Sequence, residues 1–306
     1  MEYRVFQYGV DDCYIKTIHE GAFVAGLSVV GAEEWFSQRF EQNPLGKAIL
    51  VCAFDGDRVV SCVTVEKMPI QHDGKSFVGG CMHVLFAQEG YGTQDMWVGL
   101  LKVIEKECEH QGIDLVVDFN DQNLFAYVQG LGWKYRQGMV RYQFNSVTGL
   151  WRSILKLLDL GKPFIADVKR EQSDGVQKEM TDNAGIPDYY KWLIRTSNKK
   201  FVVVDNKEVC AVVVIGLRGK RVREAQVCYF EPKNSVGAAQ RSLVEFVKGH
   251  FTKNEVDVVS CVDGKNYLSK KNTLRTSQEV SYCYKFLGEL IDFQIGEIAQ
   301  PEVLLP

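Results

Sequence analysis

Residues 84–108 read VLFAQEGYGTQDMWVGLLKVIEKEC, and this stretch decides the interpretation of the whole chain. It begins as a short apolar strand and passes through a turn that contains Gly90 and Gly92. Apolar residues follow at helical spacing, which predicts a helix with one apolar face: Trp97, Leu100, Leu101, Ile104 and Cys108. Glycines allow close approach to the backbone, and the first N–H groups of a helix have no partner inside it. The stretch predicts either a site for an anion such as pyrophosphate or an ordinary strand-to-helix connection.

Composition describes a globular chain long enough for two domains, with 306 residues, 46% apolar and 25% charged. A net charge of −3 provides no general attraction to nucleic acid or to an anionic membrane. No apolar run is long enough to span a membrane, and the N-terminus, MEYRVFQYGVDD, does not have the pattern of a signal peptide. We therefore expect a cytoplasmic protein with neither a nucleic-acid partner nor a membrane span.

The nine cysteines form no C-x-x-C pair, and four of them lie inside apolar, strand-like runs: Cys52, Cys62, Cys210 and Cys228. They are expected to be buried thiols in a reducing compartment. The five histidines are dispersed, so the sequence has no ligand spacing typical of zinc and predicts no metal site.

The first half of the chain predicts a mixed order of helices and strands. A helix over 32–40 ends at Asn43-Pro44, and a buried strand over 49–54 turns at Asp55-Gly56 into a strand of polar alternation over 58–67. A strand over 77–86 contains Gly79-Gly80, which indicates a bulge or a close backbone approach. After the helix of the opening stretch come a buried parallel strand over 113–119, a short helix over 123–129 and a strand over 133–144.

The second half repeats this order after Gly161-Lys162-Pro163. The helix around Trp192 corresponds to that around Trp35, and the segments at 257–259 and 282–286 correspond to 114–116 and 140–144. We therefore interpret the chain as an internal duplication. The amphipathic segment 150–158 between the copies is either a membrane-surface helix or, as we favour, a linker helix.

This order of elements resembles that of the GNAT acyltransferases, which bind acyl-CoA. The resemblance is carried by Asn43-Pro44 with ILVCAFDGDRVVS, by VLFAQEGYGTQ as the pyrophosphate turn, and by DFNDQNLFAYVQGLGWKY. The last segment is similar to one in GNAT proteins of surface-polysaccharide gene clusters, and DYYKW at 188–192 is similar to the start of their degenerate second half. The implied fold class is α/β (α+β), with two tandem GNAT-like domains at 1–148 and 149–306, each a twisted mixed sheet flanked by helices.

The resemblance implies acetyl-CoA, or another acyl-CoA, as cofactor. Its contacts would come from Val84, Leu85, Gly90, Tyr91, Gly92 and Thr93, while Asn120 and Asn123 would bond the pantetheine arm or cap a helix. The sequence departs from the family pattern in that Glu89 stands at the family's arginine position, Phe86 at its proline and Gln94 at its last small residue. In the second copy the same alignment places Asn234, Gly237 and Ala239 on the motif.

Three residues are the catalytic candidates that the resemblance implies. Tyr127 would protonate the leaving thiolate, although it lies six residues before Trp133, where the family tyrosine usually lies five before. His83, just before the pyrophosphate turn, would accept the amine proton, and Glu66 is the alternative base. Each has a structural alternative: a core aromatic, a structural histidine and a solvated strand end.

The leading interpretation is an acyl-CoA-dependent N-acyltransferase, an acetyltransferase for a small-molecule amine such as an amino sugar. A non-catalytic GNAT-like scaffold that binds CoA or a partner is the alternative. Transfer of an aminoacyl group from tRNA is a third interpretation, which the acidic net charge and the absence of a Lys/Arg run disfavour.

Overall fold

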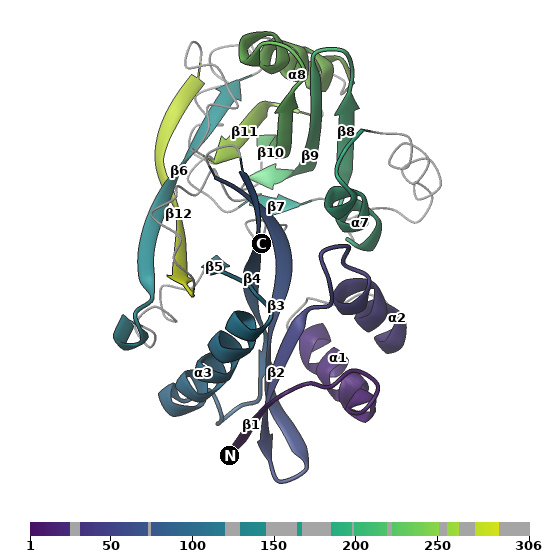
Figure 1. The fold of residues 1–306 in the computed structure, drawn as a ribbon. Helices are drawn as coiled ribbons and strands as arrows, with labels where there is room; N and C mark the ends of the chain where they lie inside the picture. Colours follow the sequence, from purple (N-terminus) through teal and green to yellow (C-terminus); the bar gives the residue numbers. More distant parts are fainter. Residues whose placement is uncertain are drawn as a thin grey trace. The chain divides into compact units, whose positions relative to one another are not determined.

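The computed structural model describes residues 1–24, 31–72, 75–119, 129–144, 164–166, 185–197, 199–218, 222–250, 256–262 and 273–287. The predicted short helix over 123–129 falls mostly outside these residues, and the predicted linker helix over 150–158 entirely so. The chain divides into two compact units, Met1–Arg136 with Ser281–Asp292 and Gln137–Val280 with Phe293–Pro306. Each unit is a mixed α/β structure built around its own strands (Figure 1).

Unit 1 has the strand order β1-β2-β3-β4-β5-β12. The bounds are β1 Glu2–Val5, β2 Ile49–Asp55, β3 Arg58–His72, β4 Lys75–Ala87, β5 Leu115–Phe119 and β12 Thr273–Phe286. All neighbours are antiparallel except β4 and β5, which are parallel. A parallel pair requires a long crossover connection, and here the crossover is the helix predicted from the opening stretch.

Helices cover both faces of this sheet (Figure 1). Helix α3 (Gln94–His110) places Leu100, Leu101 and Ile104 against one face, as the sequence predicts. The other face is covered by α1 (Ile15–Val24), α2 (Ala32–Phe36) and a π-helical turn, η2 (Ser37–Glu41), with a short 3₁₀ turn, η1 (Asp12–Tyr14), before α1. The helix predicted over 32–40 therefore continues beyond Phe36 with wider turns.

Strand β3 corrects one prediction from the sequence. Every residue from Val59 to Glu66 is buried, so this stretch is not half-exposed with polar alternation. The reason is that α3 covers one face of β3 and the α1/α2 layer covers the other, so Ser61, Thr64 and Glu66 lie inside.

The Gly79-Gly80 pair in β4 marks a close approach and not a bulge. A Cβ at Gly79 would lie 2.1 Å from Ile70 Cδ1, and one at Gly80 would lie 2.4 Å from Val65 Cγ1. Both glycines keep an unbroken register with β3. Glycine is therefore needed so that neighbouring side chains can pack directly on the strand.

Unit 2 repeats the order of elements found in unit 1. Its described strands are β6 Lys134–Phe144, β7 Phe164–Ala166, β8 Phe201–Asp205, β9 Val209–Arg218, β10 Val222–Pro232 and β11 Val258–Val262. Its helices are α7 (Asp188–Thr196) and α8 (Val236–His250). The 3₁₀ turn before β6, η3 (Gln129–Leu131), belongs to unit 1. A hairpin (β8–β9), a third strand (β10), a helix (α8) and a parallel strand (β11) follow one another, as β2–β3, β4, α3 and β5 do.

Strands β6 and β12 each contribute residues to both units. The end of β12 pairs with β5, with Tyr284 opposite Val117. Most of β6 lies in unit 2, where Tyr142 pairs with Ser260 of β11. Both units are consequently discontinuous in sequence, because backbone pairing joins strands regardless of their separation along the chain. No helix among the described residues has the length and apolarity that a membrane crossing needs.

Candidate active site

The turn between β4 and α3 has the geometry of an anion site. Gly90 has a φ of 86°, a left-handed conformation that favours glycine. Thr93 caps the helix: its Oγ1 accepts from the Met96 amide at 3.3 Å, and its carbonyl accepts from the Trp97 amide at 3.1 Å. The amides of the first helical residues, Gln94 and Asp95, have no carbonyl one turn earlier within the helix. These amides are placed to donate to an anion at the helix N-terminus.

Side chains and backbone of the β2–β3 hairpin hold this turn in place. The Gln88 amide donates to the Val60 carbonyl at 2.8 Å, and Gln88 Nε2 donates to the Val59 carbonyl at 3.1 Å. Arg58 donates to Gln88 Oε1, which brings a cation beside the turn. Tyr91 OH donates to Asp55 Oδ2 at 2.6 Å, and this bond raises the pKa of Tyr91.

Strands β4 and β5 part immediately before the turn. Among the described residues, their ladder consists of Gly80–Met82 opposite Val116–Asp118. Strand β4 continues from His83 to Ala87, while β5 stays paired with β12 as far as Phe119. A bulge accompanies the parting, because Val63 pairs with Val84 and Cys62 with Phe86, which leaves Leu85 as the extra residue. Beyond Met82, β4 keeps its pairing with β3, while the edge that faced β5 has no strand partner among the described residues.

Four side chains make a polar patch on the face of the sheet covered by α1 and α2. Thr64 pairs with His83, and Glu66 with Cys81, so all four project from the same face of β3 and β4. We call these four residues the polar square. Arg39 of η2 reaches it, with its Nε 2.8 Å from Glu66 Oε1, and the Glu66 side chain is 9% exposed.

The thiol of Cys81 is not an activated nucleophile. Burial raises its pKa well above the ordinary value, and the nearby carboxylates of Glu66 and Asp118 raise it further, against a smaller opposite effect of Arg39. Because a thiolate is the reactive form, Cys81 stays a neutral thiol near pH 7. Cys81 is therefore poorly suited to form a covalent intermediate.

The sequence-predicted residues that the structure describes fall into two groups, one on β3 and β4 and one in the turn after β4. His83 and Glu66 lie in the polar square, and Val84 and Leu85 follow it, with Val84 36% exposed and Leu85 buried. Gly90, Tyr91, Gly92 and Thr93 form the turn at the end of the strand. Asn120, Asn123 and Tyr127 lie outside the described residues. Glu89 is exposed.

Sequence reasoning missed Arg39, Arg58 and Thr64. Arg39 and Glu66 are separated by 27 residues, and Arg58 and Gln88 by 30, so no local spacing links either pair. A signal existed only for Thr64: it is a polar residue inside a run of valines, VVSCVTV, in which an inward-facing polar side chain needs a reason.

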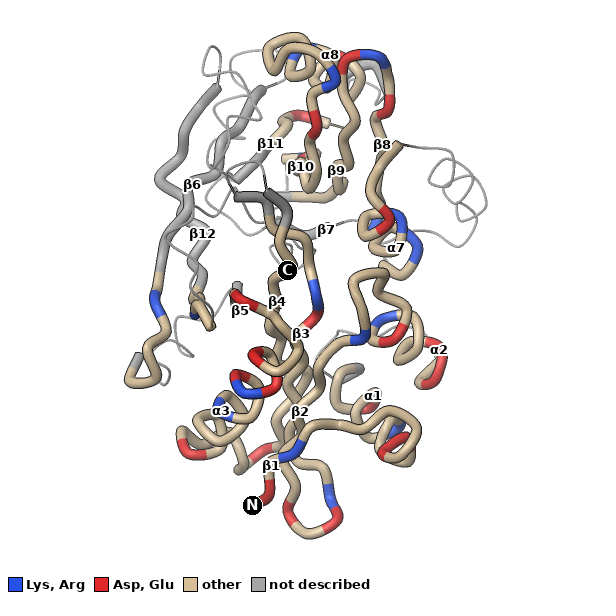
Figure 2. Tube along the Cα trace, viewed as in Figure 1, with Lys and Arg blue, Asp and Glu red and all other residues tan. Residues whose placement is uncertain are grey.

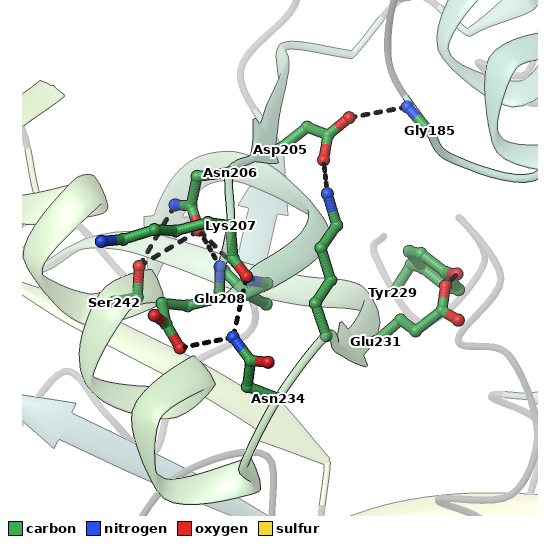
Figure 3. Close-up of polar contacts among 11 residues, drawn as sticks. Gly185, Asp205, Asn206, Lys207, Glu208, Tyr229, Glu231, Asn234 and Ser242 are labelled. Atoms are coloured by element: carbon green, nitrogen blue, oxygen red, sulfur yellow. Dashed lines mark hydrogen bonds and ion pairs between the residues drawn. The ribbon is translucent and has the colours of Figure 1, made fainter.

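Different hydrogen bonds and ion pairs hold the corresponding turn in unit 2 (Figure 3). Lys233 pairs with Asp205, whose other oxygen accepts from the Gly185 amide at 2.7 Å. Asn234 Nδ2 donates to the Lys207 carbonyl at 3.1 Å and to Glu208 Oε2 at 3.2 Å. Two carboxylates therefore lie beside this turn, and its cation is already paired.

Unit 2 also shares the bulge that accompanies the parting strands. Strands β10 and β11 pair over Glu224–Gln226 and Val258–Ser260, and Cys228 is the extra residue of β10 opposite β9. In both units, therefore, the two parallel strands part and the strand before the turn carries a bulge. The units differ in the polar groups around the turn.

No protein-family model matches the sequence, and no curated protein matches it. Solved structures do match its fold. A GCN5-related N-acetyltransferase from Anabaena variabilis has a TM-score of 0.58 at 10% identity, covering 94% of this chain and 73% of that one. A probable N-acyltransferase from Enterococcus faecalis (TM-score 0.56, 9% identity, 94% and 73% covered) and Eis1 from Mycobacterium abscessus (0.56, 12%, 94% and 74%) are similar to the same extent. In each of the two units a pair of parallel strands parts, and a turn leads from one of them into a helix. This chain has the fold of the GCN5-related N-acetyltransferases.

Proposed function

We propose that this protein transfers an acyl group from acyl-CoA to the nitrogen of a small-molecule amine. The observation that carries the proposal is the parting of β4 and β5 after Met82 and Asp118, directly before the helix N-terminus of α3. An extended chain with amide groups, such as pantetheine, can hydrogen-bond the edge of β4 where it parts from β5, much as an added strand does. Its pyrophosphate then meets the amides at the start of α3.

Acetyl-CoA is the proposed cofactor, held by unit 1. Val84 and Leu85 would line the pantetheine, Gly90 to Thr93 would face the pyrophosphate, and Asn120 and Asn123 would bond the pantetheine arm. Arg58 supports the assignment, because it supplies near the turn a positive charge that Glu89 does not. The proposed sequence halves, 1–148 and 149–306, would then be a cofactor-binding copy and a degenerate one.

The proposed reaction is a direct acyl transfer. The free amine attacks the thioester carbonyl carbon, an N–C bond forms, and the C–S bond breaks to release CoA. His83 would accept the proton that the amine loses, with Glu66 as the alternative base, and Tyr127 would protonate the departing thiolate. The proximity of His83 and Glu66 on neighbouring strands supports their roles, and the neutral thiol of Cys81 is consistent with a reaction without an acyl-enzyme.

A CoA-binding scaffold without turnover is the second candidate, and Glu89 beside the turn favours it because a carboxylate repels pyrophosphate. Calorimetric titration with acetyl-CoA, together with release of free CoA thiol in the presence of amines such as glucosamine, separates the two. Saturable binding with amine-dependent thiol release is the expected result. Binding without release for any amine tested would establish the scaffold, and no binding at all would reject both.

A further inference from the structure

The two sequence halves, 1–148 and 149–306, exchange their last strands. Strand β6 follows β5 in the first half as β12 follows β11 in the second. Among the described residues, however, β5 pairs with β12, and β11 pairs with β6. Unit 1, which otherwise consists of residues from the first half, therefore contains a strand end that the second half supplies.

Strand β5 is held more extensively by β12 than by β4. All of β5, Leu115–Phe119, pairs with Tyr282–Phe286 of β12, whereas only Val116–Asp118 pairs with β4. The Leu287 amide continues the ladder by donating to the Asp114 carbonyl at 2.8 Å. Beyond the end of the β4 ladder, β12 is the one strand in the described part of the chain that still pairs with β5. The direction in which β5 leaves β4 therefore depends on β12.

Side-chain contacts also hold the end of β12 in unit 1. Cys283 is 1% exposed and belongs to the core that α3 covers, and Leu287 packs against the same core. Lys285 Nζ lies 2.6 Å from Glu105 Oε2 of α3, and these two side chains are only 22% and 14% exposed. Strand β12 thus contacts both elements that define the proposed acyl-CoA site, β5 by its backbone and α3 by a half-buried ion pair.

We propose that β12 is a positioning element for the acyl-CoA site of unit 1, with Lys285 as its positioning residue. This inference rests on the proposed function. The opening for pantetheine exists because β5 parts from β4, and β12 holds β5 in that course. The amides that meet pyrophosphate belong to α3, which Lys285 joins to β12 through Glu105. The second half therefore has a role in cofactor binding even though its own turn lies beside two carboxylates: it completes the site of the first half.

The test compares substitutions of two lysines with similar exposure. Lys285→Met keeps the aliphatic stem and removes the charge, and Lys285→Arg keeps the charge. Lys191→Met is the matched control, because the Lys191 side chain is 23% exposed and its ion-pair partner, Asp188, lies one turn away on the same helix. Calorimetry measures the dissociation constant of acetyl-CoA on the full chain, well below the melting temperature of each variant, so that every protein compared is folded.

Lys285→Met is expected to bind acetyl-CoA about fivefold more weakly than the wild type, which is at the lower end of ordinary coupling between two sites. Lys285→Arg should restore most of the affinity, and Lys191→Met should bind as the wild type does. A role confined to stability would lower the melting temperature of Lys285→Met and leave its dissociation constant unchanged. That result overturns the inference.

Hydrogen exchange provides a second measurement, which needs no substitution. Acetyl-CoA should slow amide exchange at 115–119 and at 282–286 together, because one ladder joins these segments. The β8–β9 hairpin of unit 2 is the internal control and should exchange at an unchanged rate. Slower exchange in β4 and its turn without any change at 282–286 contradicts the proposed role of β12.

Failure of the proposed function can be distinguished from failure of this inference. If the wild type does not bind acetyl-CoA, the proposed function is rejected, and the exchange of strands is tested by itself. A recognition sequence for a site-specific protease is inserted between Thr148 and Gly149, and the folded protein is cleaved. The fragments should remain one complex of the intact mass in native buffer, because each keeps a strand paired in the sheet of the other. Their separation without denaturant would reject β12 as the strand that completes unit 1.

Discussion

Lys285 Nζ lies 2.6 Å from Glu105 Oε2, although 180 residues separate the two in the chain. Glu105 belongs to α3, and its other oxygen accepts from Trp133 Nε1 at 2.8 Å. The Glu105 carboxylate of α3 thus binds two residues that are far apart in sequence. Trp133 directly precedes β6, and Lys285 lies in β12. This ion pair therefore links α3 to β12, the last strand in the chain.

Replacing Glu105 should therefore destabilise unit 1. Glu105→Ala leaves Trp133 Nε1 and Lys285 Nζ without their acceptor, and we expect a loss of about 1–3 kcal/mol in the free energy of unfolding. Glu109→Ala, an exposed change on the same helix, is the control and should be neutral. Denaturant unfolding measures the difference, and faster hydrogen exchange in β5 and the end of β12 should locate it. Equal stability of the two variants would mean that Glu105 does not anchor these strands.

Alanine substitution should change the stability of the protein at Gly90 but not at Gly92. Gly90 has a φ of 86°, so Gly90→Ala should destabilise by about 1 kcal/mol. A Cβ at Gly92 would meet nothing within 4 Å, so Gly92→Ala should fold as stably as the wild type. If the pyrophosphate approaches this backbone, Gly92→Val weakens acetyl-CoA binding while stability is kept. Gly237→Val in unit 2 is the matched control, and an equal loss of binding there would move the cofactor site away from unit 1.

Glu89 offers an electrostatic test, because it is exposed beside the turn. Glu89→Arg exchanges a repulsive charge for an attractive one, worth about 0.3–1 kcal/mol each way near a helix N-terminus. Acetyl-CoA should bind several-fold tighter, with a larger gain at low salt. Titration at two salt concentrations measures this. A gain that is indifferent to salt would show that the charge at position 89 does not act on the bound pyrophosphate.

Replacing Arg58 should have the opposite effect on acetyl-CoA affinity. Arg58→Gln removes the cation next to the turn but can still hydrogen-bond Gln88. We expect weaker acetyl-CoA binding, by about three- to fivefold at low salt, and little change in melting temperature. Lys47→Gln, an exposed change on an ion pair near the N-terminal helices, is the control for general charge effects. Identical affinities for both variants would remove Arg58 from the cofactor site.

Asp205 makes the stability of unit 2 dependent on pH. The Gly185 amide and then Lys233 lower the pKa of its carboxyl below the ordinary value. A lowered folded-state pKa contributes stability that is present above the unfolded value of about 3.9 and is lost as the pH falls through the folded value. Asp205→Asn should therefore melt below the wild type by a constant amount between pH 5 and 8, and the gap should close in more acidic buffer. Asp188→Asn, a surface change, should leave the profile unaltered.

The sequence alone determined the features that depend on local chemistry. The apolar spacing of 97–108 specified α3 and the face it buries. The β2–β3 hairpin with its Asp55-Gly56 turn, the parallel strand after α3 and the repeated order in unit 2 also followed from pattern. In each case the information lies within one element or between adjacent ones, where hydrophobic period and turn chemistry act directly.

Only the tertiary structure decided which distant residues meet. The full burial of β3 required both helical layers to be placed, so its polar residues looked like a solvated face in the sequence. The pairing of β12 with β5 and of β6 with β11 joins strands that no local signal connects. The contacts of Arg39 with Glu66 and of Arg58 with Gln88, and the isolation of the Thr64 hydroxyl, arise from cross-strand register and layer packing. Backbone hydrogen bonds pair any two strands whose edges are free, so which strands pair, and hence which side chains share a site, is fixed by the assembled fold.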